Sequence, residues 1–209
     1  DHDTLDGLAR FQIALQQRGI GFLPGVEITA TTPDGMIHLL AYGFNPADPM
    51  LRQMLFAIRR QYLVTPAIML ESLKEICSRF IRRPPGVNGG CVLPKRLGIR
   101  EVAAVVHQAG GLLFLAHPLV VHPELADLDA ALEELKLEGL DGLEAIYGPY
   151  DETMRGDLAH LAENHDLLVS FGTDFHGGPI FPSLNTVGID IPDHHWGAFH
   201  KAIGGSSQS

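Results

Sequence analysis

The apolar run Leu167-Leu168-Val169-Ser170-Phe171 leads directly into Gly172-Thr173-Asp174-Phe175-His176-Gly177-Gly178. An apolar run of this length, followed by glycine, is typical of a buried parallel strand. Asp174 and His176 then lie just beyond the C-terminal end of that strand, which is where α/β barrels build their active sites. Aspartate and neutral histidine together bind Mn, Zn or Fe. The run therefore predicts a metal site; an ordinary strand end followed by a loop histidine is the alternative.

Strands and helices alternate on the N-terminal side of this run. Strands are expected at 112–116, 142–147 and 167–171, with helices at 124–138 and 151–165 between them. This alternation predicts a parallel sheet with covering helices, arranged either as a barrel or as an open sheet. His117 follows the first of these strands directly, at its C-terminal end.

The N-terminal part of the chain has a different pattern. A helix is expected from residue 4 to about residue 18, and strands at 21–29 and 36–44 follow, joined by a Pro-Asp-Gly turn. Because a short turn places two strands side by side, Glu27 and His38 are expected to be neighbours.

Residues 48–97 form an insertion within what we expect to be a single domain, residues 1–209. The segment 48–80 is helical in character, with Pro66 at a kink or a break, and 82–94 is a loop rich in proline and glycine. A further helix is expected at 99–109. Basic residues gather around the loop: Arg79, Arg82, Arg83, Lys95 and Arg96.

The composition argues against several classes of protein. A hydrophobic fraction of 45% is normal for a globular chain, and no apolar run has the length of a membrane span. The net charge of −10 disfavours a broad surface for duplex nucleic acid. Cys77 and Cys91 have neither a metal-binding nor a disulfide-type spacing. We therefore expect a cytoplasmic protein with no membrane partner.

Ionisable side chains recur at the predicted strand ends: His2, Glu27, His38, His117, Asp174 and His176. Taken alone, each has an ordinary explanation, such as a helix cap for His117 or an arginine partner for Glu27. Six such groups are costly to bury unless they are paired or bind a metal, so a metal cluster explains them together. The other histidines are expected at the surface or at helix ends: His107, His122, His160, His165, His194, His195 and His200.

Several short motifs occur in a fixed order along most of the chain: Asp1-His2-Asp3-Thr4, Gly25-Val26-Glu27-Ile28-Thr29, His38-Leu39-Leu40, Ala109-Gly110-Gly111, Leu115-Ala116-His117-Pro118 and Gly172-Thr173-Asp174-Phe175-His176-Gly177. In these the chain resembles the PHP (polymerase and histidinol phosphatase) family. It is most similar to the branch that hydrolyses nucleoside 3′,5′-bisphosphates and trims the 5′ ends of short RNA. The resemblance implies a distorted (β/α)7 barrel with two or three Mn, Fe or Zn ions at its C-terminal mouth.

The chain departs from the family pattern in two places. Family members begin with a His-x-His and a nearby Asp on the first strand, and here nothing precedes Asp1, so we expect this chain to lack that strand. The branch also has a Gly-Arg-Pro-His segment that helps to bind phosphate. Here residues 81–86 read Ile-Arg-Arg-Pro-Pro-Gly, without the histidine. Arg83 could still meet a phosphate, and an exposed basic loop is the alternative.

The resemblance also implies a distribution of metal ligands. One site would use Glu27, His38 and His117, and it is the complete one. A second site would use His2 and His176, and a third would keep Glu27 as a bridge together with Asp174. We therefore expect this chain to bind fewer metals than a complete family member and to have little activity. An exposed barrel edge would favour association between chains, and so a homo-oligomer.

The implied chemistry is hydrolysis of phosphomonoesters by a metal-activated hydroxide. His176 or His2 would give a proton to the leaving alkoxide. Arg82, Arg83 and Lys95 would bind a second phosphate of a small nucleotide or a short oligonucleotide.

Three further interpretations remain open from the sequence. Tyr147 or Tyr150 either stacks on a base or packs at the barrel rim. The chain could instead be a PHP domain that has lost its chemistry and has a structural or regulatory role. It could also be a histidinol-phosphate phosphatase, which would share the metal ligands and differ in substrate.

Overall fold

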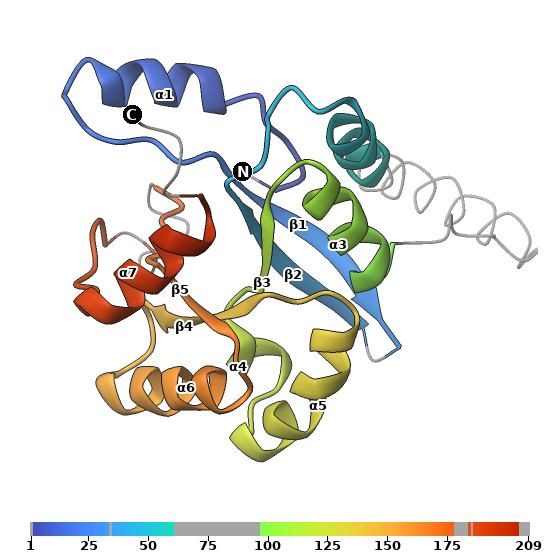
Figure 1. Cartoon of the computed structure of the whole chain (residues 1–209), viewed down its shortest axis with the longest axis vertical. Helices are drawn as coiled ribbons and strands as arrows, with labels where there is room; N and C mark the ends of the chain where they lie inside the picture. The colour runs from blue at the N-terminus through green and yellow to red at the C-terminus, as the bar shows by residue number, and fades with distance from the viewer. Residues whose placement is uncertain (1, 34, 61–96, 178–183, 185, 205–209) are drawn as a thin grey trace, which may run out of the picture.

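The computed structural model describes residues 2–33, 35–60, 97–177, 184 and 186–204. These residues form one sheet with the strand order β1-β2-β3-β4-β5. Its members are β1 (Gly25–Thr32), β2 (Gly35–Tyr42), β3 (Leu112–Leu115), β4 (Gly142–Tyr147) and β5 (Leu168–Gly172). The protein therefore has a mixed five-stranded α/β fold, which is drawn in Figure 1.

The sheet changes direction at β3. β1 pairs with β2 and β2 with β3 in antiparallel fashion, whereas β3, β4 and β5 are parallel to one another. The predicted hairpin and the predicted parallel strands after residue 112 are both confirmed. In the described parts of the chain the sheet is open, so a closed seven-stranded barrel stays a prediction.

Helices connect and cover the strands. They are α1 (Leu8–Gln16), α3 (Ile99–Gln108), α4 (Pro118–Val121), α5 (Leu125–Leu137), α6 (Glu152–Asn164) and α7 (Asp193–Ala202), and residues 49–60 are also helical. The sequence predicted helices at the positions of α1, α3, α5 and α6 but not at α7. Most of the predicted insertion lies outside the described residues, including Arg82, Arg83 and Lys95. Within the described parts of the chain, no helix is both long enough and apolar enough to span a bilayer.

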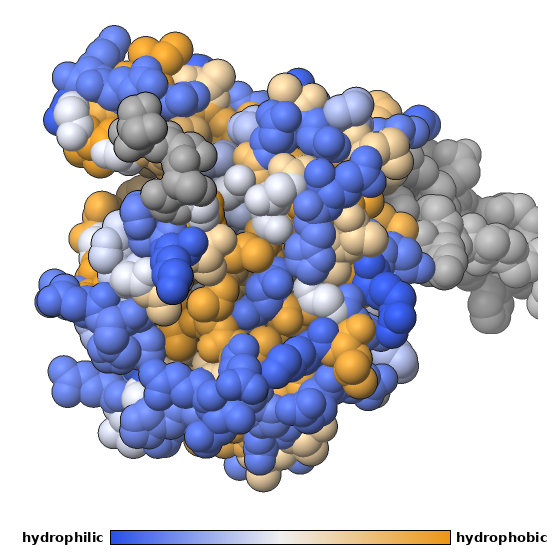
Figure 2. Space-filling model, in the orientation of Figure 1, coloured by the Kyte–Doolittle hydropathy of each residue, from blue (hydrophilic) through white to orange (hydrophobic). Residues whose placement is uncertain are grey.

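One face of the sheet is apolar and packs against α3, α5 and α6. Val26, Ile28 and Leu39 belong to the same buried cluster as Val106 of α3 and Leu132 of α5. Alternate residues of a strand point to opposite faces, so Glu27 and His38 lie on the other face. Figure 2 shows hydrophilic residues over α5 and α6, with apolar ones toward the middle of the view.

Helix α7 packs on the second face of the sheet. Phe199 of α7 lies 5.4 Å from the ring of Tyr42 and 5.6 Å from that of Phe114, measured between ring centroids. It also lies 5.0 Å from the ring of Phe171, at the end of β5. An aromatic cluster thus fills part of this face, and the polar side chains occupy the rest.

Candidate active site

Glu27 and His38 meet across the β1–β2 hairpin. The strand register pairs Glu27 with Leu40 and Thr29 with His38, so Glu27 and His38 are diagonal neighbours on one face. Glu27 Oε1 lies 3.0 Å from His38 Nδ1. The hairpin therefore places a carboxylate and an imidazole in contact, as the sequence predicted.

His117 reaches the same carboxylate from the end of β3. Its backbone has a φ of 31°, in the left-handed region that residues other than glycine rarely adopt. The backbone N–H donates to Glu144 Oε2 at 2.8 Å, which helps to hold this conformation. The ring Nε2 then lies 3.4 Å from Glu27 Oε1 and 3.3 Å from His38 Nδ1.

The N-terminal residues bring a third imidazole to Glu27. His2 forms a parallel bridge with Glu27, and its Nε2 lies 3.3 Å from Glu27 Oε2. The buried Asp3 accepts hydrogen bonds from the backbone and hydroxyl of Thr29, at 2.8 and 2.9 Å, which fixes the segment against β1. Burial raises the pKa of Asp3, although the hydrogen bonds from Thr29 oppose this.

Asp174 and His176 close the other side of the site, just beyond β5. Asp174 also has a left-handed φ, 52°. Its Oδ2 accepts a 2.8 Å hydrogen bond from the hydroxyl of Tyr147. His176 Nδ1 donates to the backbone carbonyl of Asp174 at 2.7 Å, and the His176 and His2 rings are 6.3 Å apart. The structure thus brings together all six residues that the sequence singled out.

Glu144 and Tyr147 of β4 also contact residues of this site. The sequence did not identify Glu144, and it offered Tyr147 only for stacking on a base or packing at the barrel rim. Residues three apart on a regular strand point to opposite faces. A bulge at Ala145 shifts the register between Glu144, which pairs with Ser170, and Tyr147, which pairs with Gly172. Both side chains therefore face the site. A polar residue inside the apolar run 142–147 was the available signal for Glu144.

The charge of Glu27 is strongly favoured. Burial alone would raise its pKa, but hydrogen bonds from His117 and His38 hold the pKa well below its usual range. Burial likewise disfavours the charged form of His117, yet Glu27 and other nearby carboxylates raise the pKa of this imidazole. Burial lowers the pKa of His2 despite the attraction of Glu27.

The two residues of β4 have shifted pKa values as well. Burial raises the pKa of Glu144 to about 7, although the His117 backbone N–H stabilises its charged form. Burial and the hydrogen bond to Asp174 also raise the pKa of Tyr147, so its hydroxyl stays protonated and donates to that carboxylate. Glu144 thus holds the backbone of His117, and Tyr147 holds the carboxylate of Asp174.

The donor atoms around Glu27 fit a divalent cation. Glu27 Oε1, His38 Nδ1 and His117 Nε2 form a triangle with sides of 3.0, 3.3 and 3.4 Å. Ligands that bind tetrahedral zinc at roughly 2.0–2.2 Å lie about 3.3–3.5 Å from one another. Within the described residues, His117 Nδ1, the ring nitrogen that is not part of this triangle, is buried without a hydrogen-bond partner, and such atoms are rare. A carboxylate with several imidazoles is also a suitable donor set for Mn, Fe or Zn.

A cavity of about 680 Å³ adjoins this cluster. His38 and His117 line it, and the β1–β2 hairpin, α3 and α5 contribute to its walls. Its lining includes apolar side chains such as Ile99, Val120 and Leu135. Arg100 is the one arginine or lysine among the described residues that line it.

Comparison with known proteins identifies the chain's relatives. It is 27% identical over 213 residues to a 3′,5′-nucleoside bisphosphate phosphatase from Chromobacterium violaceum, covering 84% of this chain and 75% of that protein. It is 26% identical over 211 residues to a 5′-3′ exoribonuclease from Haemophilus influenzae, covering 84% and 77%. No family model matches the chain.

Solved structures resemble the fold. A metal-dependent phosphoesterase, so described, from Bifidobacterium adolescentis matches with a TM-score of 0.71 and 25% identity, over 97% of this chain and 84% of that one. An amidohydrolase from Chromobacterium violaceum matches with a TM-score of 0.67 and 24% identity, over 84% and 75%. The expected hydrolase class is confirmed by these relatives, and a metal-dependent neighbour supports the use of divalent metal. The chain is thus a homologue of a 3′,5′-nucleoside bisphosphate phosphatase and of a 5′-3′ exoribonuclease, the two activities of the branch that its motifs resemble.

Proposed function

We propose that this protein is a metal-dependent phosphoesterase that removes phosphate from small nucleotides. Its substrate would be a nucleoside 3′,5′-bisphosphate or the end of a short oligonucleotide. The observation that carries the proposal is the placement of Glu27 Oε1 within 3.0 Å of His38 Nδ1 and 3.4 Å of His117 Nε2, beside a cavity. The names of the relatives support the class of substrate.

Glu27, His38 and His117 would hold the principal metal ion, either Mn, Fe or Zn. His2, Asp174 and His176 would complete the cluster toward the opening, where His2 and His176 are exposed. When bound, a divalent ion at this cluster supplies Lewis-acid stabilisation of the phosphate and activates water for attack. The ionised Glu27 carboxylate balances part of the positive charge that this chemistry requires.

The two exposed imidazoles are alternative candidates for the proton donor to the leaving alkoxide. A ring nitrogen that binds a metal has no proton to give, so the proton would come from whichever of the two rings is not a metal ligand. A backbone carbonyl can only accept a hydrogen bond, so the contact between His176 Nδ1 and the carbonyl of Asp174 places a proton on Nδ1. This fixes the orientation of the ring, with Nε2 on the far side of the imidazole. The backbone of His2 forms a parallel bridge with Glu27, and its ring Nε2 lies 3.3 Å from Glu27 Oε2.

The nucleoside part of the substrate would occupy the adjoining cavity. A volume of about 680 Å³ suits a single nucleotide, since ligand sites usually measure ~300–1,000 Å³. Apolar side chains such as Val120 and Leu135 offer a surface for a base, and Arg100 offers a charge for a distal phosphate. Arg82, Arg83 and Lys95, which lie outside the described residues, remain proposed ligands of that second phosphate.

The proposal is tested with Glu27→Gln, which keeps the shape of the side chain and removes its charge. Zn²⁺ or Mn²⁺ binding and hydrolysis of a nucleoside 3′,5′-bisphosphate are both measured. Loss of an outer-shell partner typically costs about 10–100-fold in metal affinity or activity, so loss of this carboxylate should cost at least about 100-fold in both. Glu124→Gln, at the exposed start of α5, is the control and should change neither. Equal metal binding by Glu27→Gln and wild type would refute the proposal.

A further inference from the structure

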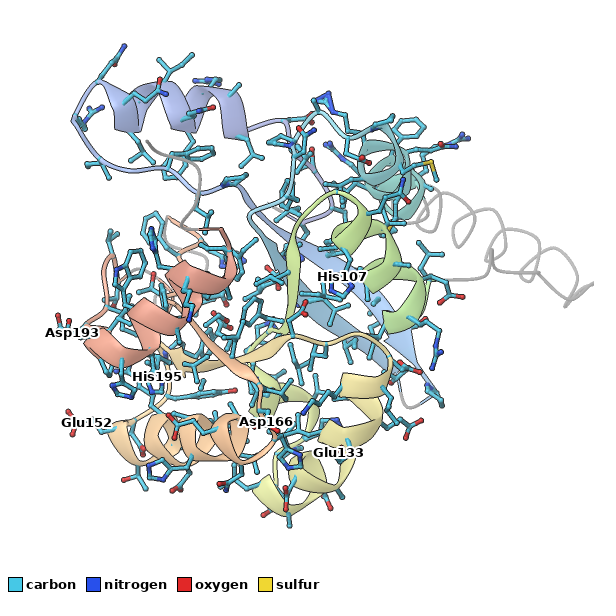
Figure 3. The ribbon with its side chains drawn as sticks, in the orientation of Figure 1. His107, Glu133, Glu152, Asp166, Asp193 and His195 are labelled. Carbon is cyan, nitrogen blue, oxygen red and sulfur yellow. The ribbon has the colours of Figure 1, made fainter. Side chains whose placement is uncertain are left out.

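A second group of metal-ligand side chains lies between α6 and α7. Glu163 is near the end of α6, and His194 and His195 are in the first turn of α7. One ligand atom from each of these residues lies within 4.8 Å of the others. Figure 3 shows His195 between the two helices. The sequence predicted a surface or helix-end position for both histidines. Both do lie at a helix end, but His195 is buried.

The two imidazoles converge to an unusual degree. Neighbouring residues on a helix do not face each other, yet the His194 and His195 ring centroids are 3.9 Å apart. His195 Nδ1 lies 3.9 Å from Glu163 Oε1, which is too far for a hydrogen bond. His160, one turn before Glu163, is close enough for its charge to interact with that of His195. Three ligand-type side chains, Glu163, His194 and His195, therefore surround one point, with His160 nearby.

The burial of the His195 side chain points to a bound ligand. It is 8% exposed, and in the described part of the chain its imidazole makes no hydrogen bond to another residue. Among the described residues, His117 Nδ1 is the one fully buried side-chain nitrogen or oxygen without a hydrogen-bond partner, so the ring nitrogens of His195 are within reach of solvent and of a small ion. A cavity of about 530 Å³ borders His195 and is also lined by Asp190 and Thr173, so small solutes have access to this side of the ring.

We propose that Glu163, His194 and His195 bind a divalent transition-metal ion, with Zn²⁺ the best match, at a site separate from the Glu27 cluster. One carboxylate and two imidazoles are typical zinc ligands, and they leave a fourth position for water or for His160. Mg²⁺ and Ca²⁺ prefer all-oxygen sites and should bind poorly. This second site does not depend on the proposed function, because it shares no residue with the cluster around Glu27.

The site would fix the position of α7 on the sheet. Phe199, one turn beyond His195, packs against Tyr42, Phe114 and Phe171 on the face that carries the Glu27 cluster. A metal bridge from α7 to α6 would hold this aromatic cluster in place. The expected role is therefore structural, and its loss should be visible in stability before it is visible in catalysis.

The experiment counts zinc per chain and measures the Zn²⁺-dependent rise in melting temperature. The test variant combines Glu163→Gln with His194→Ala, both exposed positions, so the apo protein should fold as wild type does. We expect it to bind one zinc ion fewer than wild type and to lose affinity at α7 by at least about 10-fold. His200→Ala, exposed on the same helix, is the control and should keep the ion.

A background carrying His38→Ala and His117→Ala separates the two sites. In that background the chain should still bind one zinc ion, and adding Glu163→Gln with His194→Ala should abolish it. If the background chain does not fold, hydrogen exchange of α7 in otherwise wild-type protein replaces it. Zn²⁺ should slow exchange there in wild type and not in the test variant. An unchanged zinc count in the test variant, or no effect of Zn²⁺ on α7, would overturn the inference.

Discussion

Glu27 is the residue on which the candidate site is centred. Its two oxygens face three imidazoles, those of His2, His38 and His117, at 3.0 to 3.4 Å. Such an arrangement leaves the carboxylate ionised, because its burial is outweighed by its hydrogen bonds. A fixed negative charge among imidazole nitrogens provides what a divalent cation needs, and it makes this position the most sensitive to substitution.

Tyr147 should orient Asp174 through its hydroxyl. Tyr147→Phe removes the 2.8 Å hydrogen bond to Asp174 Oδ2 and keeps the ring. We expect metal affinity at the cluster to fall about 10–100-fold, with a loss of only about 0.5–1.5 kcal/mol in the free energy of unfolding. Metal titration and urea denaturation measure the two effects.

Tyr150→Phe is the matched control for this prediction. Its hydroxyl accepts from the backbone N–H of Leu119 and makes no contact with Asp174, and the two tyrosine rings are 4.8 Å apart. Its loss should lower stability without changing metal affinity. Equal metal affinity in the two variants would show that Tyr147 does not position Asp174.

The sequence predicted which residues belong to the candidate site where they lie in a motif or at the end of an apolar strand. His38, His117 and Asp174 interrupt or follow apolar runs, so their convergence could be expected from the sequence. Tyr147 could not be placed, because its direction depends on the bulge at Ala145. A one-residue bulge leaves no distinct mark in a run that is apolar apart from Glu144.

At the level of single elements, β4 is packed with little spare room. A Cβ at Gly142 would lie 2.3 Å from the carbonyl oxygen of Leu168 and 2.4 Å from the ring of Phe114. Gly142→Ala should therefore lower the free energy of unfolding by about 1–3 kcal/mol. Gly156→Ala, at an exposed position within α6 with no neighbour within 4 Å, should raise it by about 0.5–1 kcal/mol. Opposite signs in urea denaturation confirm the packing of β4, and a neutral Gly142→Ala would contradict it.

Helices α5 and α6 are joined by a histidine that responds to pH. His165 lies 2.7 Å from Glu133 and 2.6 Å from Asp129, while Lys136 donates to its backbone carbonyl. Figure 3 labels Glu133 on α5. The hydrogen bonds to Asp129 and Glu133 raise the pKa of His165. The resulting stabilisation is fully present below the unfolded pKa of about 6.5, and it is lost as pH rises through the higher folded value.

The corresponding prediction compares wild type with His165→Gln. The difference in melting temperature should be largest near pH 6 and should shrink toward pH 9, because the stabilisation is lost as the pH rises through the raised pKa of His165. A difference for His165→Gln that stays constant across this range would show that the ion pairs do not contribute.

The whole molecule divides into an apolar side and a polar side of one sheet. The alternation of strands and helices after residue 112 predicted the parallel half, and the hairpin signals predicted the antiparallel half. The sequence did not predict α7, although Phe199 and Trp196 fall on a helix that covers part of the polar face. The two adjacent histidines and the glycine of α7 give this segment a low intrinsic helix propensity. Packing against Tyr42 and Phe114 therefore provides much of the stability of the helix.

We propose that the face of the sheet around Glu27 is a metal centre. The most direct measurement is an anomalous-difference map from crystals soaked in Zn²⁺ or Mn²⁺, recorded at the absorption edge of the metal. We predict a peak facing Glu27 Oε1, His38 Nδ1 and His117 Nε2, and no such peak in crystals of Glu27→Gln. The absence of anomalous density beside Glu27 in the metal-loaded wild-type protein would contradict the proposed metal centre.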